Sequence, residues 1–400
     1  MQRQFFHLWR DPTLRMLSLA ALLFGCFAAS IGPYQSLIAI NIFGLSDAVY
    51  AGILMASLAV SVGMAVGIGI ITDQRPSRRI MALLASTGIA LGGAVVWLGD
   101  SAAAFIVAHV LLLPIGGTLL GQIFAVARLV IAPLPAADRD AIIAFIRSFF
   151  AFPFVAVLPF WGLALQNGLP LRALYPALLI IGALALLLVL RKWPRDARAT
   201  WIEQKSGLGF RASLAEMLVF PILIRVMLIG SIHLGGALAG VVVGLIFCEI
   251  GGYGPGMIGL FFGLFVSGEI IISMNAFRLL RYMRRLHIMA IGTGFFALFL
   301  ITLPLVTPSG FVWLLVLPIG LGGGLIYALA IGYLQDLMGS RAGAGASLLA
   351  LQRIASDGLA AAVFAIGTWA SGYGLVPILG GIVMLSAMGC LLWLDRNRPD

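Results

Sequence analysis

Hydrophobic and polar positions fall in long blocks along this chain, with apolar stretches of about 20 residues separated by short polar ones. A helix of that length crosses the ~30 Å hydrocarbon core of a bilayer. The stretches lack the period of two that a membrane barrel strand requires, so helices are the expected element. The pattern predicts an all-α membrane protein with twelve transmembrane helices. The expected spans are 16–43, 50–71, 80–98, 105–131, 141–165, 174–190, 218–248, 257–277, 288–306, 311–334, 344–369 and 375–394.

One long polar stretch, residues 191–211, divides the chain, and six predicted spans lie on each side of it. It carries six basic and two acidic residues and too few apolar ones to bury a core of its own. We therefore expect an N-terminal six-helix bundle at 1–190, a cytoplasmic linker at 191–215 and a C-terminal six-helix bundle at 216–400.

Composition supports a membrane protein, because 62% of the residues are hydrophobic, 10% are charged and the mean hydropathy is +1.09. A soluble globular protein typically has about 25% charged residues. The formal net charge of +10 would suit a nucleic-acid partner, but the charges lie in short loops between spans. We therefore expect membrane lipid and no nucleic acid as a partner.

Arginines are unevenly distributed between the two sets of loops. Loops after even-numbered spans hold most of them, whereas the opposite loops hold Arg172 alone. Positively charged loops stay on the cytoplasmic side. The expected location is the bacterial inner (plasma) membrane, multi-pass, with both termini cytoplasmic.

Several arginines recur 206 residues later in the chain. The sequence Leu-Pro-Ile-Gly at 113–116 also recurs, at 317–320. These matches predict two parallel, pseudo-symmetric six-helix repeats, which are typical of transporters whose halves rock about a midplane site. The recurring arginines are Arg75 and Arg281, Arg78 and Arg284, Arg79 and Arg285, and Arg147 and Arg353.

The loop between spans two and three reads Gly69-Ile-Ile-Thr-Asp73-Gln-Arg75-Pro-Ser-Arg78-Arg79. It resembles the signature of the major facilitator superfamily, although the glycine that follows the aspartate in that family is missing here. Within the superfamily the chain is most similar to bacterial sugar efflux transporters. Residues 331–338, 342–346 and Arg353 carry this likeness, supported by 33–37, 124–128, 147–148, 268–270 and the arginines after span eight.

The resemblance implies the major facilitator fold and export of small sugars or glycosides, in exchange for protons, by alternating access. A multidrug or other small-molecule proton antiporter of the same superfamily is the alternative. A membrane-embedded enzyme or sensor is the alternative from another class, but no catalytic cluster or additional soluble domain stands out. No metal-ligand spacing or nucleotide loop is evident, so we expect no enzyme activity, no cofactor, no catalytic residue and no metal.

Charged residues within the spans are the candidates for proton coupling, because a charge at bilayer depth is costly and is by default functional. Glu269 lies well inside span eight, and burial favours its neutral form while a nearby arginine favours the carboxylate. A structural ion pair is the alternative role. Asp357 is the second candidate, although it lies one turn beyond Arg353 and the two residues are expected to pair.

Sugar recognition needs hydrogen-bonding groups and an aromatic face, and the spans offer a limited set of both. Intramembrane amides also serve as contacts between helices, and arginines near helix ends extend to the interface, so structural roles remain open. Asn41, His109, His233 and Asn275 are further polar groups within the spans, and a lone histidine on an apolar face is expected to be a hydrogen-bonded packing residue. The substrate-binding candidates are Tyr34, Gln35, Gln122, Arg147, Trp161, Tyr327, Gln352 and Arg353.

The resemblance further implies a cytoplasmic gate formed by Asp73, Arg75 and Arg79. A charge cluster in a short loop is otherwise a solvated topology signal. The glycines of spans four and ten, Gly116, Gly117 and 322–324, are expected to allow close helix packing or bending. The expected partners are a small-molecule substrate and protons, and a monomer satisfies every feature of the sequence.

Overall fold

The structure is a computed structural model, and it describes residues 10–74, 78–195, 219–337 and 345–396. In these residues every regular element is helical. Twelve helices are long and apolar enough to cross a membrane, which confirms the predicted number and order of the spans. At the majority of helix ends, the observed bound differs from the predicted one by a few residues.

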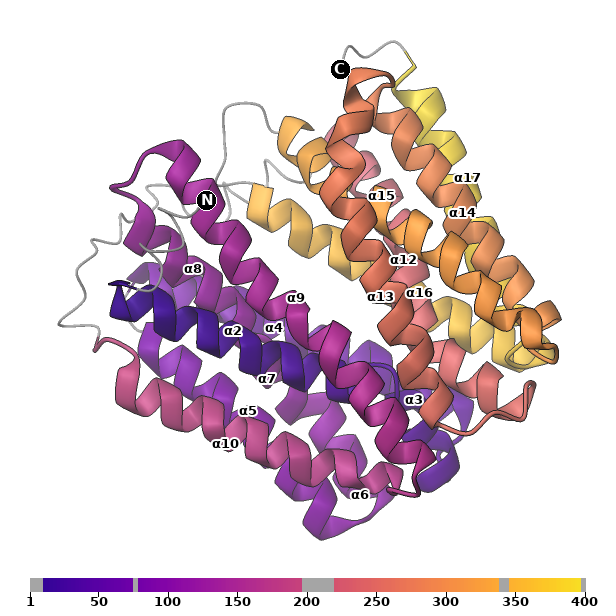
Figure 1. The fold of residues 1–400 in the computed structure, drawn as a ribbon, viewed down its shortest axis with the longest axis horizontal. Helices are drawn as coiled ribbons and strands as arrows, with labels where there is room; N and C mark the ends of the chain where they lie inside the picture. The colour runs from indigo at the N-terminus through magenta and orange to yellow at the C-terminus, as the bar shows by residue number, and fades with distance from the viewer. Residues whose placement is uncertain (1–9, 75–77, 196–218, 338–344, 397–400) are drawn as a thin grey trace. The chain divides into compact units, whose positions relative to one another are not determined.

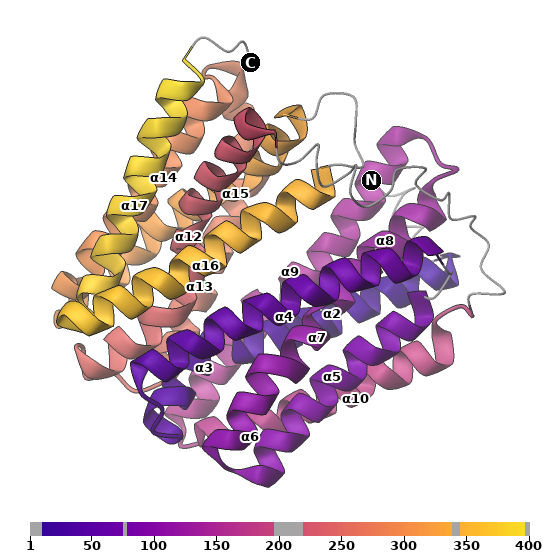
Figure 2. The same ribbon diagram turned by 180° about the vertical axis from the view of Figure 1, so that it is seen from behind.

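The elements of the N-terminal half are shown in Figures 1 and 2. In chain order they are α2 (Pro12–Ile31), α3 (Gln35–Leu37), η1 (Ile38–Ile42), α4 (Asp47–Gln74), α5 (Arg78–Gly99), α6 (Ala102–Val107), η2 (Ala108–Leu112), α7 (Leu113–Gly117), α8 (Leu119–Ile131), α9 (Ala136–Gln166), η3 (Leu171–Ala173) and α10 (Leu174–Lys192).

The elements of the C-terminal half follow in the same way. They are α12 (Phe220–Glu249), α13 (Gly256–Ala276), η5 (Phe277–Arg281), α14 (Arg285–Val306), η6 (Gly310–Leu315), α15 (Val316–Leu337), α16 (Gly345–Ser371) and α17 (Leu375–Leu394).

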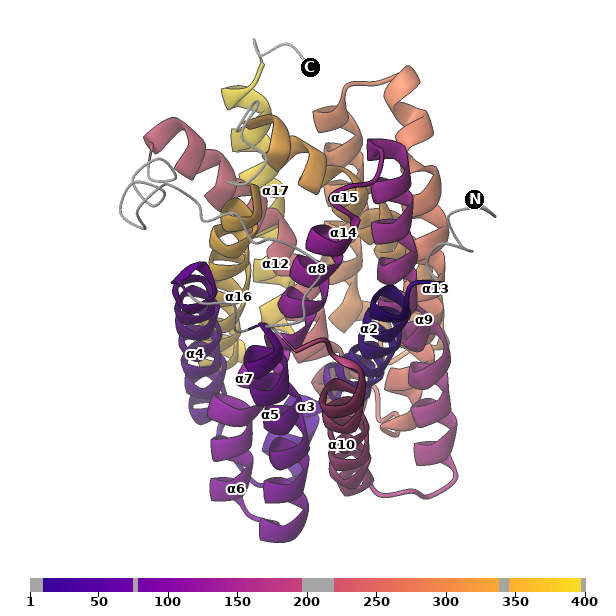
Figure 3. The same ribbon diagram turned by 90° about the vertical axis from the view of Figure 1, so that its left-hand side faces the viewer.

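Local sequence signals account for where several helices begin. Asp11 caps α2 by accepting hydrogen bonds from the Thr13 and Leu14 amides, and Pro12 occupies the first helical position. Ser101 caps α6 by accepting from the Ala104 amide. The fourth span is built from α6, η2, α7 and α8 in succession, and Figures 2 and 3 show α6, α7 and α8 following one another.

The chain divides into two compact units. The first unit comprises Met1–Gly32, Ala56–Trp161 and Gly168–Gly207. The second unit comprises Pro33–Met55, Gly162–Asn167 and Leu208–Asp400. The domain boundaries expected from the sequence, at 190 and 216, stay predictions.

In the first unit α10 packs against α5 and α2, and α5 packs against η2 and α7. Figure 1 shows α5 and α10 side by side. Glycines make the α5–α10 contact close: a Cβ at Gly93 would lie 2.6 Å from the Tyr175 carbonyl oxygen, and one at Gly182 would meet the backbone of Ala90. Small residues of this kind let membrane helices approach closely.

In the second unit α14 packs against α15 and α17, and α12 packs against α16 and α17. The pairing repeats that of the first unit, because spans three and six correspond to spans nine and twelve. One glycine pair, 206 residues apart, makes the same contact in both repeats. A Cβ at Gly116 would meet Ile89 of α5, and one at Gly322 would lie 2.7 Å from the Phe296 amide nitrogen of α14.

The expected packing role of the glycines in spans four and ten is confirmed at Gly116, Gly322 and Gly324, where a Cβ would meet atoms of a neighbouring helix. At Gly117 a Cβ would meet nothing within 4 Å, and this glycine ends α7 just before α8 begins at Leu119, where the span is interrupted. Gly323 faces the Glu269 side chain, which makes it part of the candidate site.

Candidate functional site

Glu269 lies at the midpoint of the candidate span Gly256–Arg281, and its side chain is half-buried. Its carboxylate rests on the backbone of α15, where a Cβ at Gly323 would lie 3.0 Å from Oε2. Among the described residues, no hydrogen bond or ion pair reaches this carboxylate. The structure therefore places an acidic group at membrane depth against bare helix backbone.

Tyr327 is the titratable neighbour of Glu269, close enough to interact with it electrostatically. It lies one turn after Gly323 on the same face of α15, since residues four apart are neighbours on a helix. Its hydroxyl occupies the space that a side chain at Gly236 of α12 would fill. Gly236 thus gives α12 a notch that accepts the phenol.

His233 is the third member of this cluster. Its ring centroid lies 5.2 Å from that of Tyr327, at an interplanar angle of 48°. Its Nδ1 lies 2.9 Å from the Ile229 carbonyl oxygen. Because a carbonyl only accepts, Nδ1 carries a proton and donates it to the helix backbone. Sequence reasoning assigned His233 to packing, and its contact with the predicted site residue Tyr327 was missed.

The remaining second-unit candidates lie on α16 and near the end of the first span. Arg353 Nε donates to Asp357 Oδ2 at 3.1 Å, so these two residues pair as expected. Their side chains are 71% and 35% exposed, and a pair of that exposure contributes little to stability. Gln352 and Gln35 are half-buried, and Tyr34 is fully buried in this conformation.

Three substrate-binding candidates belong to the first unit, and the structure does not bring them together. Trp161 donates from Nε1 to Ser30 Oγ at 2.9 Å, which ties α9 to α2. Gln122 is buried, and its Oε1 accepts from Arg78 at 3.4 Å. Arg147 is exposed on α9. Contact of these residues with a solute stays a prediction.

No family model matches the sequence, and no curated protein matches it. Solved structures do match. The nucleoside transporter NupG aligns with a TM-score of 0.77 and 14% identity over 97% of this chain and 100% of its own. A D-xylose-proton symporter aligns with a TM-score of 0.65 and 17% identity, over 93% of this chain and 96% of its own. The xylose transporter XylE from E. coli aligns with a TM-score of 0.67 and 17% identity, over 97% of this chain and 97% of its own.

This chain has the major facilitator fold. The alignments extend over almost the whole length of both partners, and they agree with the twelve spans and the repeated helix pairing. The likeness to sugar efflux transporters in particular stays a prediction.

The structure describes only part of the predicted cytoplasmic gate. Arg75 and the side chain of Asp73 lie outside the described residues. Arg79 donates to the Leu190 carbonyl at 2.9 Å, linking the start of α5 to the end of α10. At the equivalent position of the second repeat, Arg285 forms an ion pair with Asp336.

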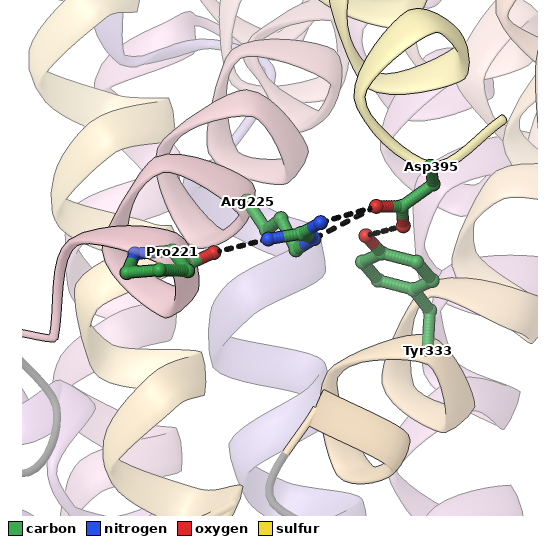
Figure 4. A network of polar contacts seen from close by, with 4 residues as sticks. All are labelled: Pro221, Arg225, Tyr333 and Asp395. Carbon is green, nitrogen blue, oxygen red and sulfur yellow. Dashed lines mark hydrogen bonds and ion pairs between the residues drawn. The ribbon is translucent and has the colours of Figure 1, made fainter. Parts of the chain in front are cut away.

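This chain also contains a polar network that the sequence analysis did not predict (Figure 4). Asp395 accepts from Arg225 Nε at 2.8 Å and from the Tyr333 hydroxyl at 2.6 Å. Arg225 also donates to the Pro221 carbonyl oxygen at 2.7 Å. The side chains of Arg225 and Asp395 are 16% and 3% exposed. The network joins α12, α15 and the end of α17, and its only signal in the sequence was a lone arginine inside an apolar run.

Two further polar contacts lie at the ends of the second unit's helices. Asn41 donates to Glu249 Oε1 at 2.9 Å, and the Tyr373 hydroxyl donates to Asp47 Oδ1 at 2.8 Å. Burial and the neighbouring Asp47 carboxylate raise the pKa of Tyr373 above its usual value, so the phenol remains a donor at neutral pH. No group of three or more His, Cys, Asp or Glu side chains that could hold a metal exists within the part of the chain that the structure describes.

Proposed function

We propose that this protein is a secondary active transporter that moves a small hydroxyl-bearing solute across the membrane, coupled to protons through Glu269. The observation that carries the proposal is Glu269 itself, an acidic group at membrane depth with no ion-pair partner among the described residues, in a fold shared with solute transporters. An ionisable residue in such a place typically belongs to a proton or substrate pathway.

Sugars or glycosides are the preferred solutes, and nucleosides are the second class to test. A structural neighbour is named as a D-xylose-proton symporter and another as a nucleoside transporter. Both classes present several hydroxyl groups, which phenol, imidazole and carboxyl groups recognise by hydrogen bonds. The proposed direction is export in exchange for protons, from a bacterial inner membrane with both protein termini in the cytoplasm.

Asp357 is the competing proton carrier, and its pairing with Arg353 favours a structural role for it. Arg353, Gln352, Gln35 and Tyr34 remain proposed solute contacts in the second unit.

The test is reconstitution of the purified protein in liposomes with an imposed pH gradient. Uptake of labelled xylose, a thiogalactoside and uridine is measured for the wild type, Glu269→Gln and Asp357→Asn. We expect gradient-driven accumulation of at least one solute, lost in Glu269→Gln and kept in Asp357→Asn. Solute exchange without a gradient should survive in Glu269→Gln, because exchange needs no net proton movement.

Export is tested separately in cells that express the protein, by a fall in thiogalactoside accumulation that a protonophore reverses. If no sugar or nucleoside is transported and a panel of apolar drugs is, the protein is a drug antiporter. If Asp357→Asn and not Glu269→Gln abolishes coupling, the proton carrier is wrongly assigned.

A further inference from the structure

The Tyr327 side chain lies close to a glycine of α12 and to the candidate proton carrier. Its hydroxyl sits in the Gly236 notch of α12, with its ring beside His233. One turn back along α15, the Glu269 carboxylate lies over Gly323, and it interacts electrostatically with Tyr327. One glycine thus makes room for the phenol and another for the carboxylate.

The carboxylate needs a hydrogen-bond donor only when it is ionised. A charged group at membrane depth is costly, and a hydrogen bond to a charged group is stronger than one to a neutral group. Among the described residues no donor is bonded to Glu269 in this structure. Tyr327 lies one turn after Gly323 on α15 and interacts electrostatically with Glu269, so its hydroxyl is the donor nearest to hand.

Other titratable groups on the helices packed against α13 are accounted for elsewhere. Arg225 and Tyr333 are bonded to Asp395, Asp336 to Arg285, and Glu249 to Asn41. Cys248 lies at the far end of α12, twelve residues after Gly236. On α16, Asp357 is bonded to Arg353. Tyr327 is the titratable group that interacts with Glu269, and His233 lies behind it, against the Tyr327 ring.

We propose that Tyr327 is a two-position switch that links the protonation of Glu269 to the packing of α12 against α15. When Glu269 is protonated, the phenol docks in the Gly236 notch and His233 holds its ring. When the Glu269 O–H bond breaks and the proton leaves to water, the phenol donates to the carboxylate and vacates the notch. His233 is a positioning residue, acting through Tyr327. The inference rests on the proposed role of Glu269 in proton coupling.

The switch gives proton binding a structural effect. Docking of Tyr327 joins α12 to α15 through a contact that exists only in the protonated state. Loss of the proton removes that contact, so the packing of these two helices has two arrangements that a proton selects. A two-state element biased by a local charge is what a coupled transporter requires.

The experiment is a pH titration of the Glu269 carboxyl group in purified protein, followed by the infrared C=O stretch of the protonated acid. The Glu269→Gln variant identifies the band. Gly236→Ala fills the notch and pushes the phenol toward Glu269, so the midpoint should fall. Tyr327→Phe removes the donor to the carboxylate, so the midpoint should rise. Each shift should be about one pH unit, a tenfold change in proton affinity.

Gly240→Ala is the matched control, because it adds the same methyl group one turn further along α12, where nothing lies within 4 Å. It should leave the midpoint unchanged. His233→Phe retains a ring against Tyr327 and should also keep the midpoint. His233→Asn keeps a donor for the Ile229 carbonyl but removes the ring, so its midpoint should fall as in Gly236→Ala. A purely structural role for the imidazole donor predicts the reverse order for these two variants.

Shifts of Gly236→Ala and Tyr327→Phe in the same direction, or no shift in Tyr327→Phe, overturn the switch. Tyr327→Phe adds no atoms and remains decisive if Gly236→Ala folds poorly. The titration needs no solute. Opposite shifts without any transport activity therefore support the switch and refute the proposed function. Proton-coupled transport with unshifted midpoints supports the proposed function and refutes the switch.

Discussion

Each unit contains a histidine beside a tyrosine within its membrane spans, and the two pairs differ in their hydrogen bonds. In the first unit His109 Nε2 and the Tyr175 hydroxyl share a hydrogen bond of 3.1 Å, and Phe105 stacks on the imidazole at 4.0 Å between ring centroids. In the second unit His233 is bonded to its own helix, and Tyr327 turns its hydroxyl away toward a glycine notch near Glu269.

The difference shows which polar groups are structural. His109 is 5% exposed, and its hydrogen bond to the Tyr175 hydroxyl holds both rings in the packed interior of the first unit. In the second unit the Tyr327 hydroxyl has no hydrogen bond in the described part of the chain, so this phenol is available to another acceptor. Both places contain the same residue types, so only the neighbouring groups distinguish the structural role from the candidate functional role.

The largest expected effect comes from breaking the Arg225–Asp395 pair, which tests whether polar groups stabilise the second unit. Asp395→Asn leaves Arg225 with no charged partner in a buried setting, which costs about 3–5 kcal/mol. Arg172→Gln in the first unit breaks a pair whose side chains are 52% and 50% exposed, which costs about 0–1 kcal/mol. Thermal unfolding of the purified variants, followed by tryptophan fluorescence, measures both. Equal losses would show that burial does not separate the two pairs.

A second prediction compares two glycines that receive the same methyl group. Gly182→Ala in the first unit meets the backbone of Ala90, which cannot move aside, so we expect a loss of about 1–3 kcal/mol. Gly236→Ala meets the end of the Tyr327 side chain, which has room to rotate, so its loss should be less than half as large. The same unfolding assay decides. If Gly236→Ala is the more damaging substitution, the notch holds a fixed phenol and no switch.

A third prediction separates the two tyrosines by the property they affect. Tyr175→Phe leaves the buried His109 nitrogen without its partner and should cost about 1 kcal/mol of stability with transport intact. Tyr327→Phe should change stability less and alter the pH dependence of transport. Unfolding and liposome uptake on the same preparations measure both properties. A transport defect in Tyr175→Phe that exceeds its loss of stability would give the first-unit pair a functional role.

The smallest effect is expected at the edge of the second unit. Tyr373→Phe removes the hydrogen bond to Asp47 and should cost about 0.5–1 kcal/mol at neutral pH. The pKa of Tyr373 is raised in the folded state, so this contribution is complete below the ordinary tyrosine pKa of about 10 and declines as the pH rises above it. The difference between wild type and variant should therefore shrink in strongly alkaline buffer. A constant difference would mean that the phenol is not the donor.

The sequence predicted the fold well because the length of the hydrophobic stretches and the repeat at an interval of 206 residues carry that information directly. It also predicted the pairing of Arg353 with Asp357, since residues four apart on a helix are always neighbours. It placed Glu269 at membrane depth, because depth follows from position within a span.

The side-chain partners were harder to predict, because they depend on which way each helix face points. Nothing in the sequence relates Arg225 to Asp395, which lies 170 residues further on. His233 was assigned to packing for the same reason. The glycine notch at Gly236 exists only once α15 lies against α12, so no local pattern marks it.

The Arg225–Asp395 pair also has a consequence for biosynthesis. A ribosome that adds about 5–20 residues per second needs roughly ten to thirty seconds to travel from one partner to the other. During that interval α12 is already made while its arginine lacks its carboxylate. The residue that follows α17 therefore completes the polar network of the second unit, and α12 waits for it until nearly all of the second unit has been made.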